Sequence, residues 1–224
     1  MFYSLGHGVL VPLSRLLYRP TIEGKDNVPL DGGVILASNH LSFIDSFAIP
    51  LVSPRKVRFL AKEEYWTGDG VKGLLQKGFF TAVGMVPVNR HSPTAAQESL
   101  DKGLEVLKAG DAFGIYPEGT RSRDGRLYRG RTGVAWLALN AQVPVVPVGL
   151  IGTQDIQPVG ASFPRLAKVT VRFGPPIGVE AYQGLPAGRA RRQLTDDVME
   201  AIAALTGQER VNAYNDVPSE VHED

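Results

Sequence analysis

The sequence predicts an α/β fold, a single domain with a mixed central sheet flanked by helices. Apolar runs with the length of strands alternate with segments of helical periodicity, which is typical of this class. The chain has 224 residues, of which 43% are hydrophobic. A chain of this size and composition can bury one full core, so we expect one domain.

Six apolar runs are predicted strands, at 33–38, 57–61, 85–88, 112–116, 144–149 and 168–173. The prolines in 144–149 confine that strand to an edge or a bulge. Helices are predicted after Ser42, from Ser92 to Gly110, and from about Pro186 to Leu205. For the second, Ser92 is the N-cap and Gly110 the stop, with an inner stripe of Ala96, Leu100, Leu104 and Leu107.

The composition excludes several classes of protein. The net charge of +1 gives no indication of a nucleic-acid binder, and no nucleic-acid partner is expected. The absence of cysteine excludes a disulfide scaffold, a cysteine-ligated zinc and a cysteinyl acyl-enzyme. His40 shares no metal-ligand spacing with His7, His91 or His222, so no metal site is predicted.

The two ends of the chain differ from the middle. Residues 1–20 are apolar with a helical stripe, but no run reaches the ~20 residues needed to span a bilayer. The segment is either a helix packed on the core or an anchor in the membrane interface, and its pattern alone favours packing on the core. Residues 21–207 form the domain, and 208–224, acidic toward the end, are expected to be a flexible tail.

His40 and Asp45 follow the buried run 33–38 and are the candidate catalytic residues. An imidazole can take a proton from a hydroxyl, and a carboxylate can orient the ring and stabilise the cation formed. The position supports this role, since ligands collect at the carboxyl ends of strands in α/β sheets. The alternative is a histidine that serves only as a satisfied polar residue.

Cationic and small residues follow three other strands. Glu118, Gly119, Thr120 and Arg121 come after 112–116, and Gly119 allows a close backbone approach. Arg121 offers a planar fork suited to phosphate, and Arg123, Arg126, Arg129 and Arg131 follow it, with Arg123 and Arg126 expected to be solvated. Arg90 follows the strand at 85–88 and Lys62 follows the strand at 57–61, so both could join the same cleft.

Four blocks, in this order, resemble the 1-acylglycerol-3-phosphate acyltransferase family of phospholipid synthesis, over residues from about 25 to 175. They are His40–Asp45, Gly84–Arg90, Tyr116–Ser122 and Val143–Leu150. Tyr116 stands where the family usually has phenylalanine, and Pro87 replaces a more commonly apolar residue. The block 143–150 is interpreted as a buried strand that could add an apolar wall.

The resemblance implies transfer of a fatty acyl group from a thioester to the hydroxyl of 1-acylglycerol 3-phosphate, giving phosphatidic acid. His40 would be the base and Asp45 its partner, while Arg90 and Arg121 would hold the phosphate. Glu118 would orient an arginine or bond a glycerol hydroxyl.

The resemblance also implies no cofactor. The donor would be acyl-coenzyme A or an acyl carrier protein, and the protein would lie at the cytoplasmic face of the cell membrane as a peripheral or monotopic protein. With the family in view, residues 1–20 are predicted to be the interfacial anchor.

Other readings stay open. The acceptor could be glycerol 3-phosphate or another lysophospholipid, or the chain could be a membrane lipid-binding protein without turnover. A serine hydrolase ranks low because no G-x-S-x-G sequence is present.

Overall fold

A six-stranded mixed sheet forms the centre of the computed structural model, which describes residues 18–68, 70–82, 84–88, 94–158, 163 and 165–215. Its strand order is β1-β9-β8-β2-β6-β3. The bounds are β1 Thr21–Glu23, β2 Val34–Ser38, β3 Val57–Arg58, β6 Ala112–Ile115, β8 Val145–Ile151 and β9 Thr170–Phe173. Only the β8–β9 pair is antiparallel among these neighbours, so the predicted mixed α/β sheet is confirmed.

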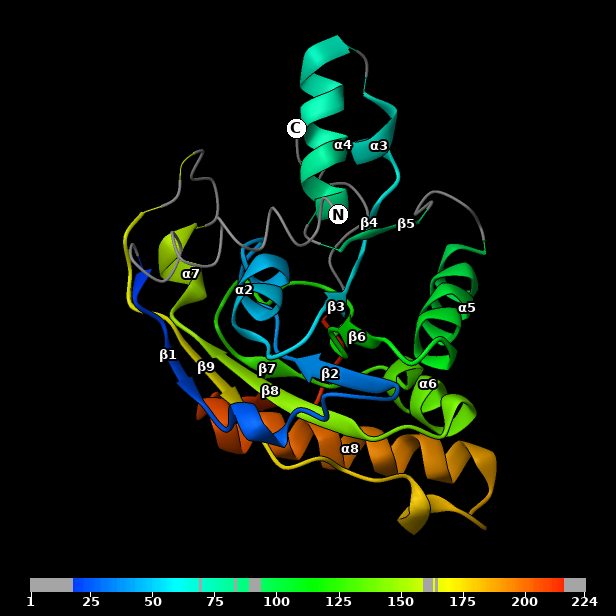
Figure 1. Cartoon of the computed structure of the whole chain (residues 1–224). Coiled ribbons are helices and arrows are strands. Elements are labelled where there is room, and N and C mark those ends of the chain that lie inside the picture. The colour runs from blue at the N-terminus through cyan, green and yellow to red at the C-terminus, as the bar shows by residue number, and fades with distance from the viewer. Residues whose placement is uncertain are drawn as a thin grey trace.

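Helices cover both faces of this sheet (Figure 1). One face packs against α5 (Ala95–Lys108), α6 (Gly133–Ala141) and α8 (Ala187–Thr206), and Ile35 and Phe113 point into that core. The other face packs against α2 (Asp45–Val52), through Leu36 and Val148. Two further helices, α3 (Glu64–Thr67) and α4 (Gly70–Ala82), rise above α2, and α7 (Thr153–Ile156) follows β8 (Figure 1).

The central strand β2 is buried on both faces along all five residues. It pairs in parallel with β6 on one side and β8 on the other. A strand in this position has no solvated face, which is why its sequence is continuously apolar until Ser38. Both β2 and β6 therefore deliver their carboxyl ends to the same edge of the sheet.

Two strand predictions need correction. The run at 57–61 is divided into β3 and β4 (Leu60–Lys62), and β4 pairs with β5 (Val86–Val88) in a separate two-stranded sheet. Strand β8 is central and buried, so of the two predicted positions, an edge or a bulge, the edge is wrong. The pairing does shift by one residue beside Pro147, between Val145↔Ile177 and Val148↔Phe173. Pro147 is tolerated there because its carbonyl accepts Gly174 N–H just before the β8–β9 ladder begins, where its missing donor interrupts little.

The helix predictions mostly hold. Helix α5 ends as predicted before Gly110, whose φ is 82°, and α8 ends at Gly207 with φ 70°. Ser92 and Pro93 lie outside the described residues, and the described helix begins after Thr94. Helix α2 begins at Asp45, three residues later than the predicted start at Ser42.

The chain after α8 departs from the predicted tail. Arg210–Val211 forms β10, which pairs in parallel with β7 (Leu127–Tyr128). The part of the predicted tail at 208–215 is thus hydrogen-bonded to the domain, and the boundary at 207 is too early. Residues 1–17 and 216–224 lie outside the described residues, so the predicted anchor and the rest of the tail stay predictions. Within the described ranges, no helix has the length and apolar character needed to cross a membrane.

Candidate active site

The imidazole of His40 lies at the carboxyl end of β2, hydrogen-bonded to Asp45. Its Nδ1 is 2.8 Å from Asp45 Oδ2. That same oxygen accepts the backbone N–H groups of Leu41 (2.7 Å) and Ser42 (2.8 Å), so the turn after His40 wraps around the carboxylate. Asp45 is fully buried, whereas 16% of the His40 side chain is exposed. An ionised carboxylate only accepts, so Nδ1 carries the proton and Nε2 keeps a free lone pair.

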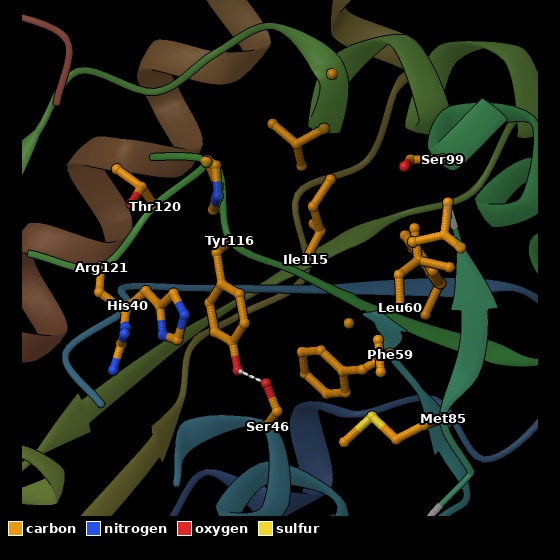
Figure 2. Close-up of a pocket in the computed structure, with 18 of the residues that line it drawn as sticks. His40, Ser46, Phe59, Leu60, Met85, Ser99, Ile115, Tyr116, Thr120 and Arg121 are labelled. Atoms are coloured by element: carbon orange, nitrogen blue, oxygen red, sulfur yellow. Dashed lines mark hydrogen bonds between the residues drawn. The ribbon is translucent and has the colours of Figure 1, made fainter. Parts of the chain in front are cut away.

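A tyrosine fixes the plane of the imidazole. The rings of His40 and Tyr116 stack with centroids 3.8 Å apart and an angle of 7° between their planes. The Tyr116 hydroxyl is 2.9 Å from Ser46 Oγ, one residue into α2 from Asp45 (Figure 2). Burial, and secondarily the charge of Asp45, raises the pKa of Tyr116 well above its ordinary value, so the hydroxyl stays protonated. Sequence reasoning gave Tyr116 no such role.

Glu118 is fully buried and stabilises the backbone of the site through two hydrogen bonds. Its carboxylate accepts Tyr128 N–H at 2.9 Å and His40 N–H at 3.3 Å. Burial raises its pKa to about 7, against the opposing effect of the two backbone hydrogen bonds. Its contacts are to main chain, and it does not line the cavity. The structure therefore does not support the expectation that Glu118 orients an arginine or bonds substrate.

The turn after β6 brings the arginine loop, residues 121–131, beside His40. Ser122 N–H donates to the His40 carbonyl at 2.8 Å, which joins the two strand ends. Gly119 has φ 81°, and a Cβ there would lie 3.2 Å from Arg131 Cδ and Nε. Both the conformation and the close approach of Arg131 explain the glycine.

A cavity of about 1010 Å³ opens between this polar end and the helices. His40, Thr120 and Arg121 lie on one side of the Tyr116 ring, and apolar side chains such as Ile115, Leu60 and Met85 lie on the other (Figure 2). Its apolar lining also includes Phe47, Phe59, Phe80, Leu100, Val134 and Leu137. Gly114 matters here, since a Cβ would come within 2.0 Å of the Phe59 ring that packs on it.

The structure brings together His40, Asp45, Gly119, Thr120 and Arg121. Arg123, expected to be solvated, is exposed yet lines the cavity with Arg131. Arg126 is exposed and pairs with Asp124 at 2.7 Å, as a solvated residue would.

The structure does not place three other predicted contributors at the site. Arg90 lies outside the described residues. Lys62 ends β4, and only its backbone is described. The block 143–150 contributes to the core and is absent from the cavity lining.

An imidazole beside a cationic loop, lining a cavity that is otherwise largely apolar, is suited to a hydroxyl-bearing substrate with an anionic group and a hydrocarbon chain. The chain matches the Acyltransferase family over residues 19–151, more than half of its length. It belongs to the acyltransferase family.

Relatives in bacteria and plants carry one name. The chain is 35% identical over 145 residues to 1-acyl-sn-glycerol-3-phosphate acyltransferase LPAT1, chloroplastic, of Arabidopsis thaliana, covering 64% of this chain and 39% of the relative. It is 25% identical over 186 residues to 1-acyl-sn-glycerol-3-phosphate acyltransferase of Bacillus subtilis, covering 82% and 86%. The chain spans only 39–40% of the length of the Arabidopsis and Brassica relatives it matches.

The fold also has a solved counterpart. The structure resembles the crystal structure of the 1-acyl-sn-glycerophosphate (LPA) acyltransferase PlsC from Thermotoga maritima, with a TM-score of 0.64 and 24% identity. The match covers 90% of this chain and 82% of the other. At this identity the likeness shows the fold alone.

Proposed function

We propose that this protein transfers a fatty acyl group from a thioester to the free hydroxyl of 1-acylglycerol 3-phosphate, forming phosphatidic acid. The carrying observation is that the His40–Asp45 pair lies where the apolar cavity meets Thr120 and Arg121. The names of the relatives in Arabidopsis thaliana and Bacillus subtilis support this acceptor. The cavity can shelter hydrocarbon, whose burial is worth ~0.8 kcal/mol per methylene.

The reaction needs one base and no covalent enzyme intermediate. His40 Nε2 takes the proton as the acceptor oxygen attacks the thioester carbonyl, so a carbon–oxygen bond forms and the carbon–sulfur bond breaks. The leaving thiolate recovers the proton from the imidazolium. Asp45 holds the ring through Nδ1 and stabilises its positive charge while it exists. Tyr116 keeps the ring in plane by stacking against it.

Arg121 is proposed to bind the acceptor phosphate and so to bring the hydroxyl to His40. Both residues line the same end of the cavity, joined through the Ser122–His40 backbone bond. Orientation of this kind can contribute ~7–11 kcal/mol in well-aligned cases. The donor is proposed to be acyl-coenzyme A or an acyl carrier protein thioester, with no cofactor.

The acceptor's chemistry also indicates where the protein works. A lysophospholipid resides in a bilayer, so we propose a peripheral or monotopic location at the cytoplasmic face of the cell membrane. Large apolar side chains exposed on α4 (Leu74) and before β9 (Phe163 and Leu166) are consistent with a lipid surface. Flotation of the full chain with vesicles containing phosphatidic acid tests this, and a protein that stays at the bottom of the gradient would contradict it.

Two variants test the proposed chemistry. His40→Ala should abolish transfer while the protein still folds, and substantial residual turnover would remove His40 as the base. Arg121→Ala should raise the KM for lysophosphatidic acid by ~10–100-fold, because a charge-assisted hydrogen bond contributes ~1.5–3 kcal/mol. An equal rise in the KM of the donor would contradict a phosphate-binding role.

A further inference from the structure

The segment 208–215, which follows α8, returns across the arginine loop, and we call it the C-terminal strap. The strap lies outside the residues that match the family, which end at 151. Its backbone pairs with the loop at two points beyond the β7–β10 pairing. Leu127 N–H donates to Glu209 O, and Arg129 N–H donates to Ala213 O, both at 2.9 Å.

The first strap contact reaches the residue before His40. Gln208 Oε1 accepts Asn39 Nδ2 at 2.9 Å, and Gln208 Nε2 donates to Gly125 O at 2.7 Å. Asn39 is fully buried, directly precedes His40, and is held by two hydrogen bonds to the Leu150 backbone. One side chain of the strap therefore joins the end of β2 to the arginine loop.

The second strap contact reaches the proposed phosphate-binding end. Asn215 Nδ2 donates to the backbone carbonyl of Arg121 at 3.0 Å. The guanidinium carbons of Arg129 and Arg131 each lie 5.3 Å from the centre of the Tyr214 ring, within the range of cation–π attraction. Arg131 in turn packs against Gly119, in the turn that carries Arg121. Tyr214 therefore supports this turn through Arg131.

We infer that the C-terminal strap is a positioning element for acceptor binding, which holds the arginine loop so that Arg121 meets the acceptor phosphate. The arginine loop is irregular apart from the two residues of β7, and an unsupported loop would lose conformational entropy when it binds an anion. The contacts of Gln208, Tyr214 and Asn215 order the loop when the protein folds, so less conformational entropy is lost when the anion binds. This inference rests on the proposed function.

The strap acts on the acceptor and leaves the chemical step to His40, which gives a distinctive kinetic signature. Asn215→Ala removes the bond to the Arg121 carbonyl and should raise the KM for lysophosphatidic acid about fivefold, the effect of one net hydrogen bond. Tyr214→Ala removes the ring shared by two arginines and should raise it ~5–10-fold. In both variants kcat and the KM for acyl-coenzyme A should stay within about twofold of wild type.

Two matched variants separate positioning from general destabilisation. Tyr214→Phe keeps the aromatic ring and should restore the wild-type KM. Asn140→Ala removes another asparagine bond to a main-chain carbonyl, from Nδ2 to Trp136 O at 2.7 Å on α6, and should leave the KM unchanged.

The experiment is steady-state transfer from labelled acyl-coenzyme A to lysophosphatidic acid, with full-length variants whose unfolding midpoints are also measured. Unchanged acceptor KM in Tyr214→Ala and Asn215→Ala, beside an active wild type, would overturn the inference alone. Equal losses in kcat and in both KM values would also overturn it, since they would indicate a purely structural strap. A wild type that does not acylate lysophosphatidic acid would overturn the proposed function and the inference with it.

Discussion

Asp45→Asn separates the charge of Asp45 from its geometry. In the structure one oxygen, Oδ2, accepts all three contacts of the carboxylate, from the His40 ring and from the N–H groups of Leu41 and Ser42. An asparagine oxygen in that place can accept the same three bonds, while its amide nitrogen takes the buried position of Oδ1, which has no hydrogen-bond partner among the described residues. The substitution therefore removes the negative charge while the turn stays intact.

The lost charge matters only when His40 becomes an imidazolium. With ~4 Å between charge centres and an effective dielectric constant of ~20, the attraction is about 4 kcal/mol. Partial exposure of His40 reduces this value, so we expect kcat to fall ~10²–10³-fold. The buried amide N–H groups, which lack an acceptor, should lower the free energy of unfolding by ~1–3 kcal/mol.

The assay is transfer from a labelled acyl thioester under saturating conditions, with urea unfolding of the same preparations. Asp111→Asn is the matched control, because Asp111 is a half-exposed carboxylate paired with Arg58 at 2.6 Å, outside the cavity lining. If Asp45→Asn keeps more than a tenth of wild-type kcat, then the carboxylate serves only to brace the turn. If Asp111→Asn lost as much activity, then the loss in Asp45→Asn could not be assigned to the charge beside His40.

Three further predictions have defined outcomes. Because burial raises the folded-state pKa of Glu118 from 4.5 to about 7, the folded protein binds more protons than the unfolded chain between these pH values. Stability should therefore fall by up to about 3 kcal/mol as pH rises through this window, and Glu118→Gln should lack that drop in urea titrations at pH 5 and pH 8; parallel pH profiles would contradict the assignment. Gly119→Ala should lower the free energy of unfolding by ~1–2 kcal/mol, because the φ of Gly119 is 81°. Gly188→Ala, in α8 with open space around it, should raise the free energy of unfolding by ~0.5–1 kcal/mol. Equal shifts of the thermal unfolding midpoint in the two variants would argue against strain at Gly119. Tyr116→Phe keeps the ring stacked on His40 and should lower kcat less than fivefold, the effect of one net hydrogen bond. Tyr116→Ala removes the ring and should lower kcat much further. Comparable losses of kcat in the two variants would show that the hydroxyl bond to Ser46 matters more than the stacking.

Local patterns made the central part of this site predictable. His40 and Asp45 lie five residues apart across one turn, so their contact follows from the end of a buried strand. The turn at 116–122 follows β6 in the same way, and β2 and β6 are parallel neighbours, which places both turns at one edge of the sheet. The glycine at 119 also carries a recognisable signal, because its positive φ demands it.

Contacts between distant segments were not predictable. Glu118 bonds the backbone of His40, 78 residues away, and nothing in its local sequence distinguishes that role from binding substrate. The strap from 208 to 215 resembles a polar tail in composition, and its function depends on pairing with Leu127 and Arg129. The prolines of β8 predicted an edge or a bulge without deciding between them, and the interruption of the β8–β9 pairing beside Pro147 permits the central position.

Some short elements could not be predicted because their sequences carry no distinct hydrophobic pattern. The strand β1 is three residues long with an exposed, half-buried, exposed pattern, so it has no apolar run to reveal it. Helix α6 is short and strongly apolar, and its periodicity is hidden because most of its surface is buried.

The most direct measurement of the central claim is the identity of the lipid product. Purified protein would be given labelled acyl-coenzyme A, or the acyl carrier protein thioester, with lysophosphatidic acid and separately with glycerol 3-phosphate. The account predicts labelled phosphatidic acid from lysophosphatidic acid with at least one donor, and its loss in His40→Ala. Product from glycerol 3-phosphate alone, or equal product from His40→Ala, would contradict it.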